Sequence, residues 1–276
     1  MNQPKTFLGM TRLSGGMYGD VYQNNFYVPQ KIVSKDLPFQ RWWDTYIKTM
    51  YIIARTIQVT DLNVLRAVKT FYFNLFQLVP DAVSRQYLAD FLQMKPYIVD
   101  MLKETAPTLF VIQPSLETYL RKRPEDFIEM CMKNADGQSL LLFVYLVNVL
   151  FKAIVPNYVH LPTMSDVRFQ YQPDKITKYE WGNAVWFILH TSSLHAPEPV
   201  SDSFVTFKNL LYALQFLLPC PKCRLHLSQN LQYIDMDNCP QNREELFKCT
   251  WELHNIVNKS DNKPVVGLQE AFGIYT

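Results

Sequence analysis

Two cysteines separated by two residues, Cys220 and Cys223, are the part of this sequence best suited to chemistry. Such a pair can close into a small disulfide that exchanges readily with other thiols, and it needs an electron acceptor beside it to do net oxidation. We expect Pro219 to end one helix and to open the next, so that the pair lies in a first turn. Unpaired amides and the helix dipole there favour the thiolate, and Arg224 adds positive charge nearby.

The same cysteines allow two other interpretations. A structural zinc site needs four ligands, and His226 and Cys239 could complete a set with the pair. The fixed second Cys/His pair of ordinary zinc modules is missing, however. The remaining interpretation is a cysteine pair without reactivity.

A second group of chemically useful residues has helical spacing. Trp251, His254, Asn255 and Asn258 recur at i, i+3, i+4 and i+7, so on a helix they share one face. One indole, one imidazole and two amides make poor core material, because each buried polar group demands a partner. A polar aromatic ligand would supply those partners. A solvated face or an interhelical hydrogen-bond network is the alternative.

Taken in order, these motifs resemble a known family. Residues 178–276 contain Trp-Gly at 181–182, Trp-x-x-x-His at 186–190, Pro-Cys-x-x-Cys-x-x-His at 219–226, His-Asn-x-Val-Asn at 254–258 and Lys-Pro at 263–264. This pattern is similar to that of the Erv/ALR family of FAD-dependent sulfhydryl oxidases. The resemblance implies a helical bundle with FAD, a thiol-containing protein as substrate, and molecular oxygen as the acceptor that becomes hydrogen peroxide.

The resemblance also implies the roles of individual residues. Cys220 would be the outer thiol that forms a mixed disulfide with the substrate, and Cys223 the thiol that contacts the flavin. No metal ligand is predicted. The implied FAD contacts are Trp181, Trp186, His190, His226, Trp251, His254, Asn255, Asn258 and Lys263.

The sequence departs from the family pattern at several positions. Asn183 follows Gly182 where the family has Arg, which removes one basic contact with the cofactor. Trp251 stands where a cysteine commonly precedes His-Asn, and no cysteine follows Lys263, which puts the family's structural disulfide in question. No shuttle pair is evident, so we expect electrons to come directly from a partner's dithiol. The sequence predicts free thiols at Cys131, Cys239 and Cys249, and structural roles for His160 and His195.

Composition limits the class of protein. With 276 residues and 48% hydrophobic residues the chain can bury a real core, and a net charge of +2 gives no field that would attract nucleic acid. The most apolar run, 140–151, is shorter than the roughly 20 residues of a membrane span, so we expect a buried helix. No secretory signal is visible in residues 1–20, and five cysteines are too few for an extracellular disulfide framework. We therefore expect a viral enzyme of the host cytoplasm or the virion, with the mitochondrial intermembrane space as the alternative.

Only eight glycines among many Leu, Phe, Tyr and Met residues predict an all-α fold. Asp81, Ser115 and Asp202 are predicted N-caps. We expect an arm at 1–35, a helical domain at 36–158, a Pro-rich linker at 159–175 and the Erv-like domain at 176–276. The predicted helices span about 38–58, 61–79, 81–104, 115–133, 138–155, 178–194, 202–218, 221–232 and 242–259.

An internal repeat could underlie the two halves. A shift of 139 residues places Asp81 and Ser84 on Cys220 and Cys223, and Tyr51 and Tyr87 on His190 and His226. The nine identities at this shift are Trp42/Trp181, Lys69/Lys208, Leu75/Leu214, Leu78/Leu217, Pro80/Pro219, Arg85/Arg224, Leu88/Leu227, Leu92/Leu231 and Gln93/Gln232.

Two interpretations of the repeat stay open. The first half is either a degenerate oxidase bundle without cofactor, as in the quiescin-type oxidases that the arrangement resembles, or a Leu-rich helical bundle that aligns by chance. The assembly would be either a homodimer or an intramolecular pseudo-dimer. The main functional prediction is an FAD-linked sulfhydryl oxidase. The alternatives are a non-enzymatic helical scaffold that retains the oxidase outline and a zinc-stabilised binding module.

Overall fold

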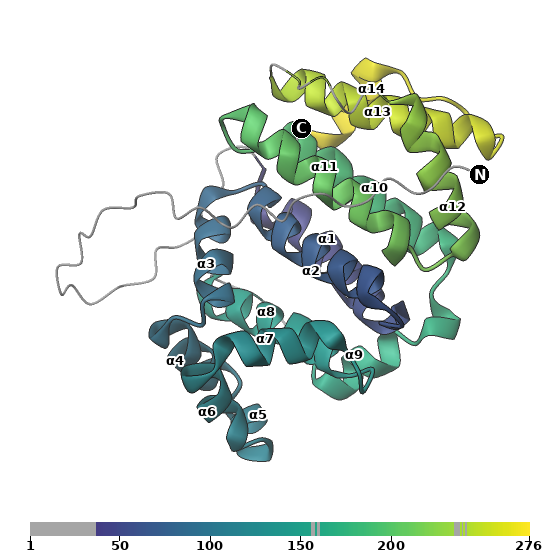
Figure 1. Cartoon of the computed structure of the whole chain (residues 1–276). Helices are drawn as coiled ribbons and strands as arrows, with labels where there is room; N and C mark the ends of the chain where they lie inside the picture. The colour runs from purple at the N-terminus through teal and green to yellow at the C-terminus, as the bar shows by residue number, and fades with distance from the viewer. Residues whose placement is uncertain (1–36, 156–157, 159–160, 235–237, 239, 241) are drawn as a thin grey trace.

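Every regular element in the part of the chain that the structure describes is a helix (Figure 1). This computed structural model describes residues 37–155, 158, 161–234, 238, 240 and 242–276. The predicted all-α class is confirmed. The expected arm at 1–35 and the predicted roles of His160 and Cys239 lie outside the described residues.

The helices of the first half come before residue 176. They are α1 Phe39–Thr56, α2 Leu62–Leu78, α3 Ala82–Leu92, α4 Pro96–Thr105, α5 Pro107–Ile112, α6 Ser115–Lys122, α7 Pro124–Lys133, α8 Ser139–Ile154, α9 Met164–Gln170 and the short 3-10 helix η1 Pro173–Lys175. The second half contains α10 Lys178–Leu194, α11 Val200–Leu217, α12 Pro221–Asn230, the 3-10 helix η2 Leu231–Tyr233, α13 Arg243–Ser260 and α14 Leu268–Tyr275.

The predicted long helices are confirmed where no proline interrupts them, but two were too long. The span 81–104 is two helices, because Met94 takes a left-handed φ of 46° and Pro96 then begins α4. The span 115–133 breaks before Pro124, which begins α7 without needing a backbone donor.

The predicted helix caps had mixed outcomes. The Asp81 side chain accepts hydrogen bonds from the amides of Val83 and Ser84, so this predicted N-cap is confirmed. Ser115 and Asp202 are not caps: α6 and α11 start after Pro114 and Pro199 respectively.

Three short helices had no counterpart among the predictions: α5, α9 and α14. The expected linker contains α9, because Thr163 and Asp166 form a capping box in which each side chain accepts the other's backbone amide. A short helix with reciprocal capping needs no long apolar repeat to form, so hydrophobic periodicity does not predict it.

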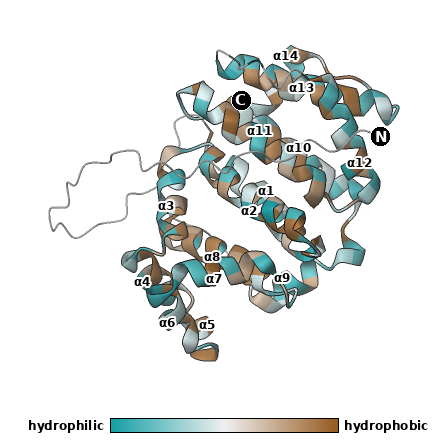
Figure 2. Cartoon of the chain, viewed as in Figure 1, coloured by the Kyte–Doolittle hydropathy of each residue, from teal (hydrophilic) through white to brown (hydrophobic). Residues whose placement is uncertain are grey.

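The two halves pack through their first two helices. α1 and α2 lie beside α10 and α11 in the middle of the molecule, with α8 and α7 on one side and α13 and α14 on the other (Figure 1). α8 is apolar along most of its length and buried, as predicted for 140–151 (Figure 2). Among the described helices none combines the length and hydropathy needed to cross a membrane.

The helix bounds in the two halves coincide under the same shift of 139 residues. It carries α1 onto 178–195, α2 onto 201–217 and α3 onto 221–231, next to the observed α10, α11 and α12. Packing follows the same order, since α8 packs against α1 as α13 packs against α10. α4 to α7 lie between α3 and α8 and have no counterpart between α12 and α13 in the described residues.

Candidate functional site

The cysteine pair lies at the start of α12. Cys220 is the N-cap residue and is joined to Cys223 in a disulfide, with the two Cα atoms 5.1 Å apart. Pro221 occupies the first helical position, and the amide of Cys223 donates to Cys220 Sγ at 3.2 Å. Both cysteines are partly exposed. The start of α12 therefore offers a sulfur that a partner can reach and a backbone donor that favours negative charge on it.

Two histidines from different helices of the second half meet each other. His190 of α10 and His254 of α13 approach within 3.0 Å, Nε2 to Nδ1, and the indole of Trp186 stacks on the His254 ring at 4.0 Å and 8°. The ring of Tyr275, from α14, stacks on His190 at 4.4 Å and 22°. We call Trp186, His190, His254 and Tyr275 the histidine cluster. α12 packs against α13, the helix that carries His254.

Both histidines are held in the neutral form. Burial, with the neighbouring His254 as a smaller cause, lowers the pKa of His190 to about 3. Burial and then the charge of Lys263 lower the pKa of His254 to about 4. In two neutral imidazoles one nitrogen donates across the 3.0 Å contact and the other accepts. His190 Nδ1 is then buried without a hydrogen-bond partner, which marks a place for a polar group of a ligand.

Two of the predicted ligand contacts are engaged with the chain itself. The Trp251 indole donates to the backbone oxygen of Val266 at 2.7 Å. The Asn255 amide donates to the same oxygen at 2.9 Å, and its Oδ1 accepts from the Val266 amide at 3.0 Å. These three hydrogen bonds fasten the segment before α14 to α13. Trp251 and Asn255 therefore position α14.

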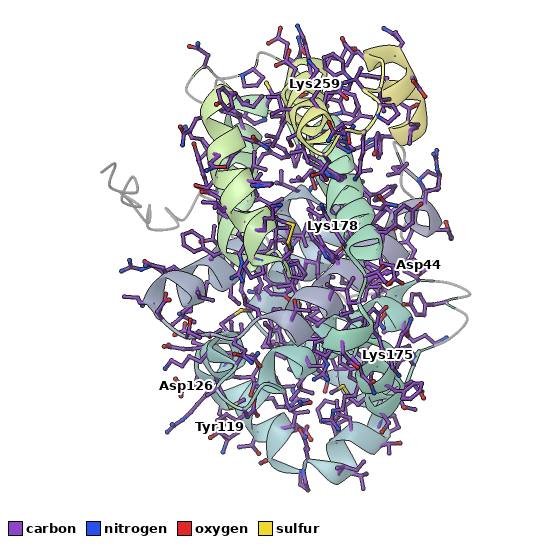
Figure 3. The ribbon with its side chains drawn as sticks, turned by 90° about the vertical axis from the view of Figure 1, so that its right-hand side faces the viewer. Asp44, Tyr119, Asp126, Lys175, Lys178 and Lys259 are labelled. Atoms are coloured by element: carbon purple, nitrogen blue, oxygen red, sulfur yellow. A yellow bond between two sulfur atoms is a disulfide. The ribbon has the colours of Figure 1, made fainter. Side chains whose placement is uncertain are left out.

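The other predicted site residues are spread around the cluster. Trp181 and Asn258 are buried, whereas His226 on α12 is partly exposed. Lys263 lies 3.6 Å from Asp261, which also pairs with Lys178 at 3.1 Å. Figure 3 marks Lys178 at the start of α10 and Lys259 near the end of α13.

A shallow cavity of about 450 Å³ borders α13. Its wall includes Trp251, Asn255 and Lys259 from α13, together with Tyr233 and the Val265 to Gly267 segment. The part of the predicted ligand face formed by Trp251 and Asn255 thus borders a hollow.

Three residues of the site were not predicted from the sequence: Tyr275, Phe247 and Val266. Tyr275 and Phe247 cover the His190 ring, the latter at 5.2 Å, and Val266 receives the hydrogen bonds from α13. Phe272 and Tyr275, three residues apart in the short segment after the Lys-Pro motif, were the signal available for α14. Val266 acts through its backbone, so its residue type carries no signal.

The zinc interpretation finds no support in the described residues. No group of three or more His, Cys, Asp or Glu side chains comes together there, and Cys220 and Cys223 are already bonded to each other. Cys131 is a free thiol, fully buried in the first half, as predicted. Cys249 lies partly exposed on α13.

Comparison with known proteins points to one family. Residues 183–273 match the family model described as Erv1 / Alr family. A putative FAD-linked sulfhydryl oxidase of Invertebrate iridescent virus 3 is 30% identical over 96 residues, which cover 34% of this chain and 65% of that protein. A probable FAD-linked sulfhydryl oxidase of Acanthamoeba polyphaga mimivirus is 30% identical over 94 residues, 33% of this chain and 66% of that protein.

A plant protein shows the same likeness. The FAD-linked sulfhydryl oxidase ERV1 of Oryza sativa subsp. japonica is 30% identical over 97 residues, 35% of this chain and 49% of that protein. No solved structure matches significantly. The chain thus spans about half to two thirds of the length of these relatives, and all three matches cover only about a third of the chain. The C-terminal region of this chain is an Erv1 / Alr family domain.

Proposed function

We propose that this protein is an FAD-linked sulfhydryl oxidase that forms disulfides in protein substrates. The observation that carries the proposal is the Cys220–Cys223 disulfide at the start of α12. α12 packs against α13, and α13 contributes His254 to the histidine cluster. The names of the viral and plant relatives point the same way. Molecular oxygen would be the final acceptor and hydrogen peroxide the product.

The residues of the cluster fit a flavin dinucleotide. His190 Nδ1 is a buried nitrogen without a partner, and Trp186 and His254 present flat ring faces. Because these two rings are 4.0 Å apart, a planar ligand would lie against an outer face of the stack rather than between them. Lys263 would supply positive charge beside His254. Bound FAD supplies the capacity to accept two electrons from a dithiol.

The chain's own cysteines would carry the thiol exchange. A substrate thiolate attacks Cys220 Sγ, the Cys220–Cys223 bond breaks, and Cys223 leaves as a thiolate. A second substrate thiolate attacks the substrate sulfur of the mixed disulfide and releases Cys220. Two substrate thiols become one disulfide, and the enzyme pair gains two electrons and two protons, which pass to the acceptor. The Cys223 amide, 3.2 Å from Cys220 Sγ, stabilises negative charge on the outer sulfur.

We further propose that the first half is a degenerate copy of the oxidase bundle that binds no FAD. Tyr51 takes the position of His190 under the shift of 139 residues. It contacts Asn148 of α8 and stacks on Tyr171 at 5.1 Å and 28°. In the same way His190 contacts His254 of α13 and stacks on Tyr275. The backbone oxygen of Tyr171 accepts a hydrogen bond from Arg55 at 3.2 Å, and the backbone oxygen of Tyr275 accepts one from His195 at 3.3 Å.

This correspondence makes α9 the counterpart of α14. In the first half the place of the histidine pair is filled by hydrogen-bonded side chains, since Tyr158 also donates to Asn148 at 2.5 Å and accepts from Trp43 at 2.9 Å. Both polar atoms of the Asn148 side chain are therefore occupied, Nδ2 by Tyr51 and Oδ1 by Tyr158. Pairing of α1 with α10 and α2 with α11 supports an intramolecular pseudo-dimer.

The viral relatives support a viral protein of the host cytoplasm or the virion.

Flavin analysis of the purified full-length protein tests the oxidase. We expect flavin absorption with one FAD per chain, and oxygen consumption with a dithiol substrate that is abolished by Cys220→Ser and by Cys223→Ser while FAD remains bound. Two FAD per chain would contradict the degenerate first half. A folded protein that stays colourless after incubation with FAD would refute the oxidase itself.

A further inference from the structure

The helix that carries His190 is contacted on its other side by the first half. α10 faces α13 and α14 with His190, and the next two residues, Thr191 and Ser192, are fully buried against α1. The phenol of Tyr46, from α1, lies 2.9 Å from Thr191 Oγ1 and 3.0 Å from Ser192 Oγ. This contact crosses from one half to the other directly behind a residue of the histidine cluster.

The direction of these hydrogen bonds follows from counting protons. Thr191 Oγ1 donates to the backbone oxygen of Phe187 at 2.8 Å, so it accepts from Tyr46. Tyr46 has one proton, and it must then accept from Ser192. The result is a directed chain from Ser192 through Tyr46 and Thr191 to the turn of α10 between Trp186 and His190. Burial raises the pKa of Tyr46 to about 12, so the phenol keeps its proton at physiological pH.

A second contact between the halves lies behind the ring that covers His190. Arg41 of α1 donates from Nη1 to the backbone oxygen of Thr276 at 2.5 Å. Thr276 follows Tyr275, whose ring stacks on His190. Arg41 and Thr276 are both exposed, so this hydrogen bond is weaker than that of the buried phenol.

We propose that the first half acts as the supporting wall of the flavin site, with Tyr46 as the main positioning residue and Arg41 as a secondary one. The inference rests on the proposed function, since the site it supports is that for FAD. Tyr46 sets the rotation of α10 at Thr191 and Ser192 and thereby the direction of the His190 ring. Arg41 holds the end of α14 and thereby Tyr275. The first half thus contributes to oxidation by positioning residues of the flavin site, without taking part in the chemistry itself.

Tyr46→Phe tests the proposal, because it removes one hydroxyl and keeps the ring. The matched control is Tyr72→Phe, which removes another fully buried hydroxyl of the first half, bonded at 2.9 Å to the backbone oxygen of Met50. We expect similar losses of overall stability in both. Only Tyr46→Phe should raise the dissociation constant of FAD, by about fivefold, corresponding to about 1 kcal/mol. It should also raise amide exchange of residues 187–195 in the FAD-free protein.

Ser192→Ala removes a hydroxyl of the same hydrogen-bond chain, this time in the second half. It should raise the FAD dissociation constant by itself and add less than its full effect in combination with Tyr46→Phe, because the two residues share one interaction. Arg41→Gln should weaken FAD binding by less than Tyr46→Phe, while the control Lys48→Gln, which breaks the exposed 3.7 Å ion pair to Glu180 in the same interface, should leave it unchanged.

The outcomes separate this inference from the oxidase assignment. If the wild type binds FAD and Tyr46→Phe and Tyr72→Phe have equal effects on it, the supporting role is wrong and the oxidase stands. If Tyr46→Phe does not fold, Ser192→Ala decides in the same way. A wild-type protein that does not bind FAD overturns both.

Discussion

Acidification should destabilise this protein through the buried histidine pair. The pKa of His190 is lowered from 6.5 to about 3 and that of His254 from 6.5 to about 4, both mainly by burial. As the pH falls below about 6.5, the unfolded chain takes up protons that the folded chain refuses, so the free energy of unfolding decreases. The stabilising effect of a neutral pair is fully present above that pH and is lost progressively toward pH 4 and below.

The magnitude follows from the pKa shifts. At pH 5 each histidine is about 1.5 pH units below its unfolded pKa, which corresponds to about 2 kcal/mol, so the pair costs up to about 4 kcal/mol. A typical domain has a free energy of unfolding of about 5 to 15 kcal/mol, so the loss is a large part of it. The buried tyrosines do not interfere, since the pKa of Tyr46 is raised to about 12, far above this window.

Urea denaturation of the FAD-free protein at pH 8.5, 7.5, 6.0 and 5.0 measures the effect. Stability should be nearly flat between pH 8.5 and 7.5 and should fall steadily below pH 6.5. His254→Gln removes one titrating group, so its loss between pH 7.5 and 5.0 should be about half that of the wild type. If the two proteins lose stability in parallel, the pair does not control acid unfolding, and the neutral hydrogen-bonded cluster is incorrect.

Three further outcomes are expected. Trp251→Phe should cost about 1 kcal/mol of stability and raise amide exchange in residues 263–276, since it loses the 2.7 Å hydrogen bond to Val266 but keeps an aromatic ring at that position; unchanged exchange there would contradict the fastening role. Asp81→Ala should cost about 1 kcal/mol in urea denaturation by uncapping α3, whereas Asp81→Asn, which can still cap, should cost less. Cys131→Ser should leave oxygen consumption with dithiothreitol unchanged, because the buried thiol is in the other half; a lost rate would give Cys131 a redox role.

The long helices could be predicted because they are rich in apolar residues and poor in glycine, and several of them, such as α8 and α11, end two residues before a proline. The span 178–194 was predicted to the residue, and Thr177 and Glu180 form a capping box at its start. The short helices could not be predicted in this way. α5, α9 and α14 have six to eight residues, too few to show a periodic pattern, and of these three only α9 has a side-chain cap.

The functional site also contains residues that could be predicted from the sequence and residues that could not. Residue type and spacing were enough to bring Trp186, His190 and His254 together as candidates, and the structure places these three in contact. Spacing on one face of α13 could not distinguish His254, which turns toward α10, from Trp251 and Asn255, which hold Val266. That difference depends on where the chain goes after residue 263, because the competing partner is the backbone oxygen of Val266, 15 residues after Trp251 and 11 after Asn255. The same limit hid Tyr275.

The packing of both halves within one chain changes what their shared surface must achieve. Two separate subunits lose translational and rotational freedom when they associate, and they part on dilution unless a large apolar area compensates. Helices joined by one polypeptide meet at an effective concentration that does not depend on how much protein is made. The surface between α1 and α10 can therefore include buried hydroxyls such as those of Tyr46, Thr191 and Ser192. Such hydroxyls orient the two helices, and they do not have to supply the binding energy that holds the halves together. Each side of the surface can also change by mutation independently of the other, which identical subunits cannot do.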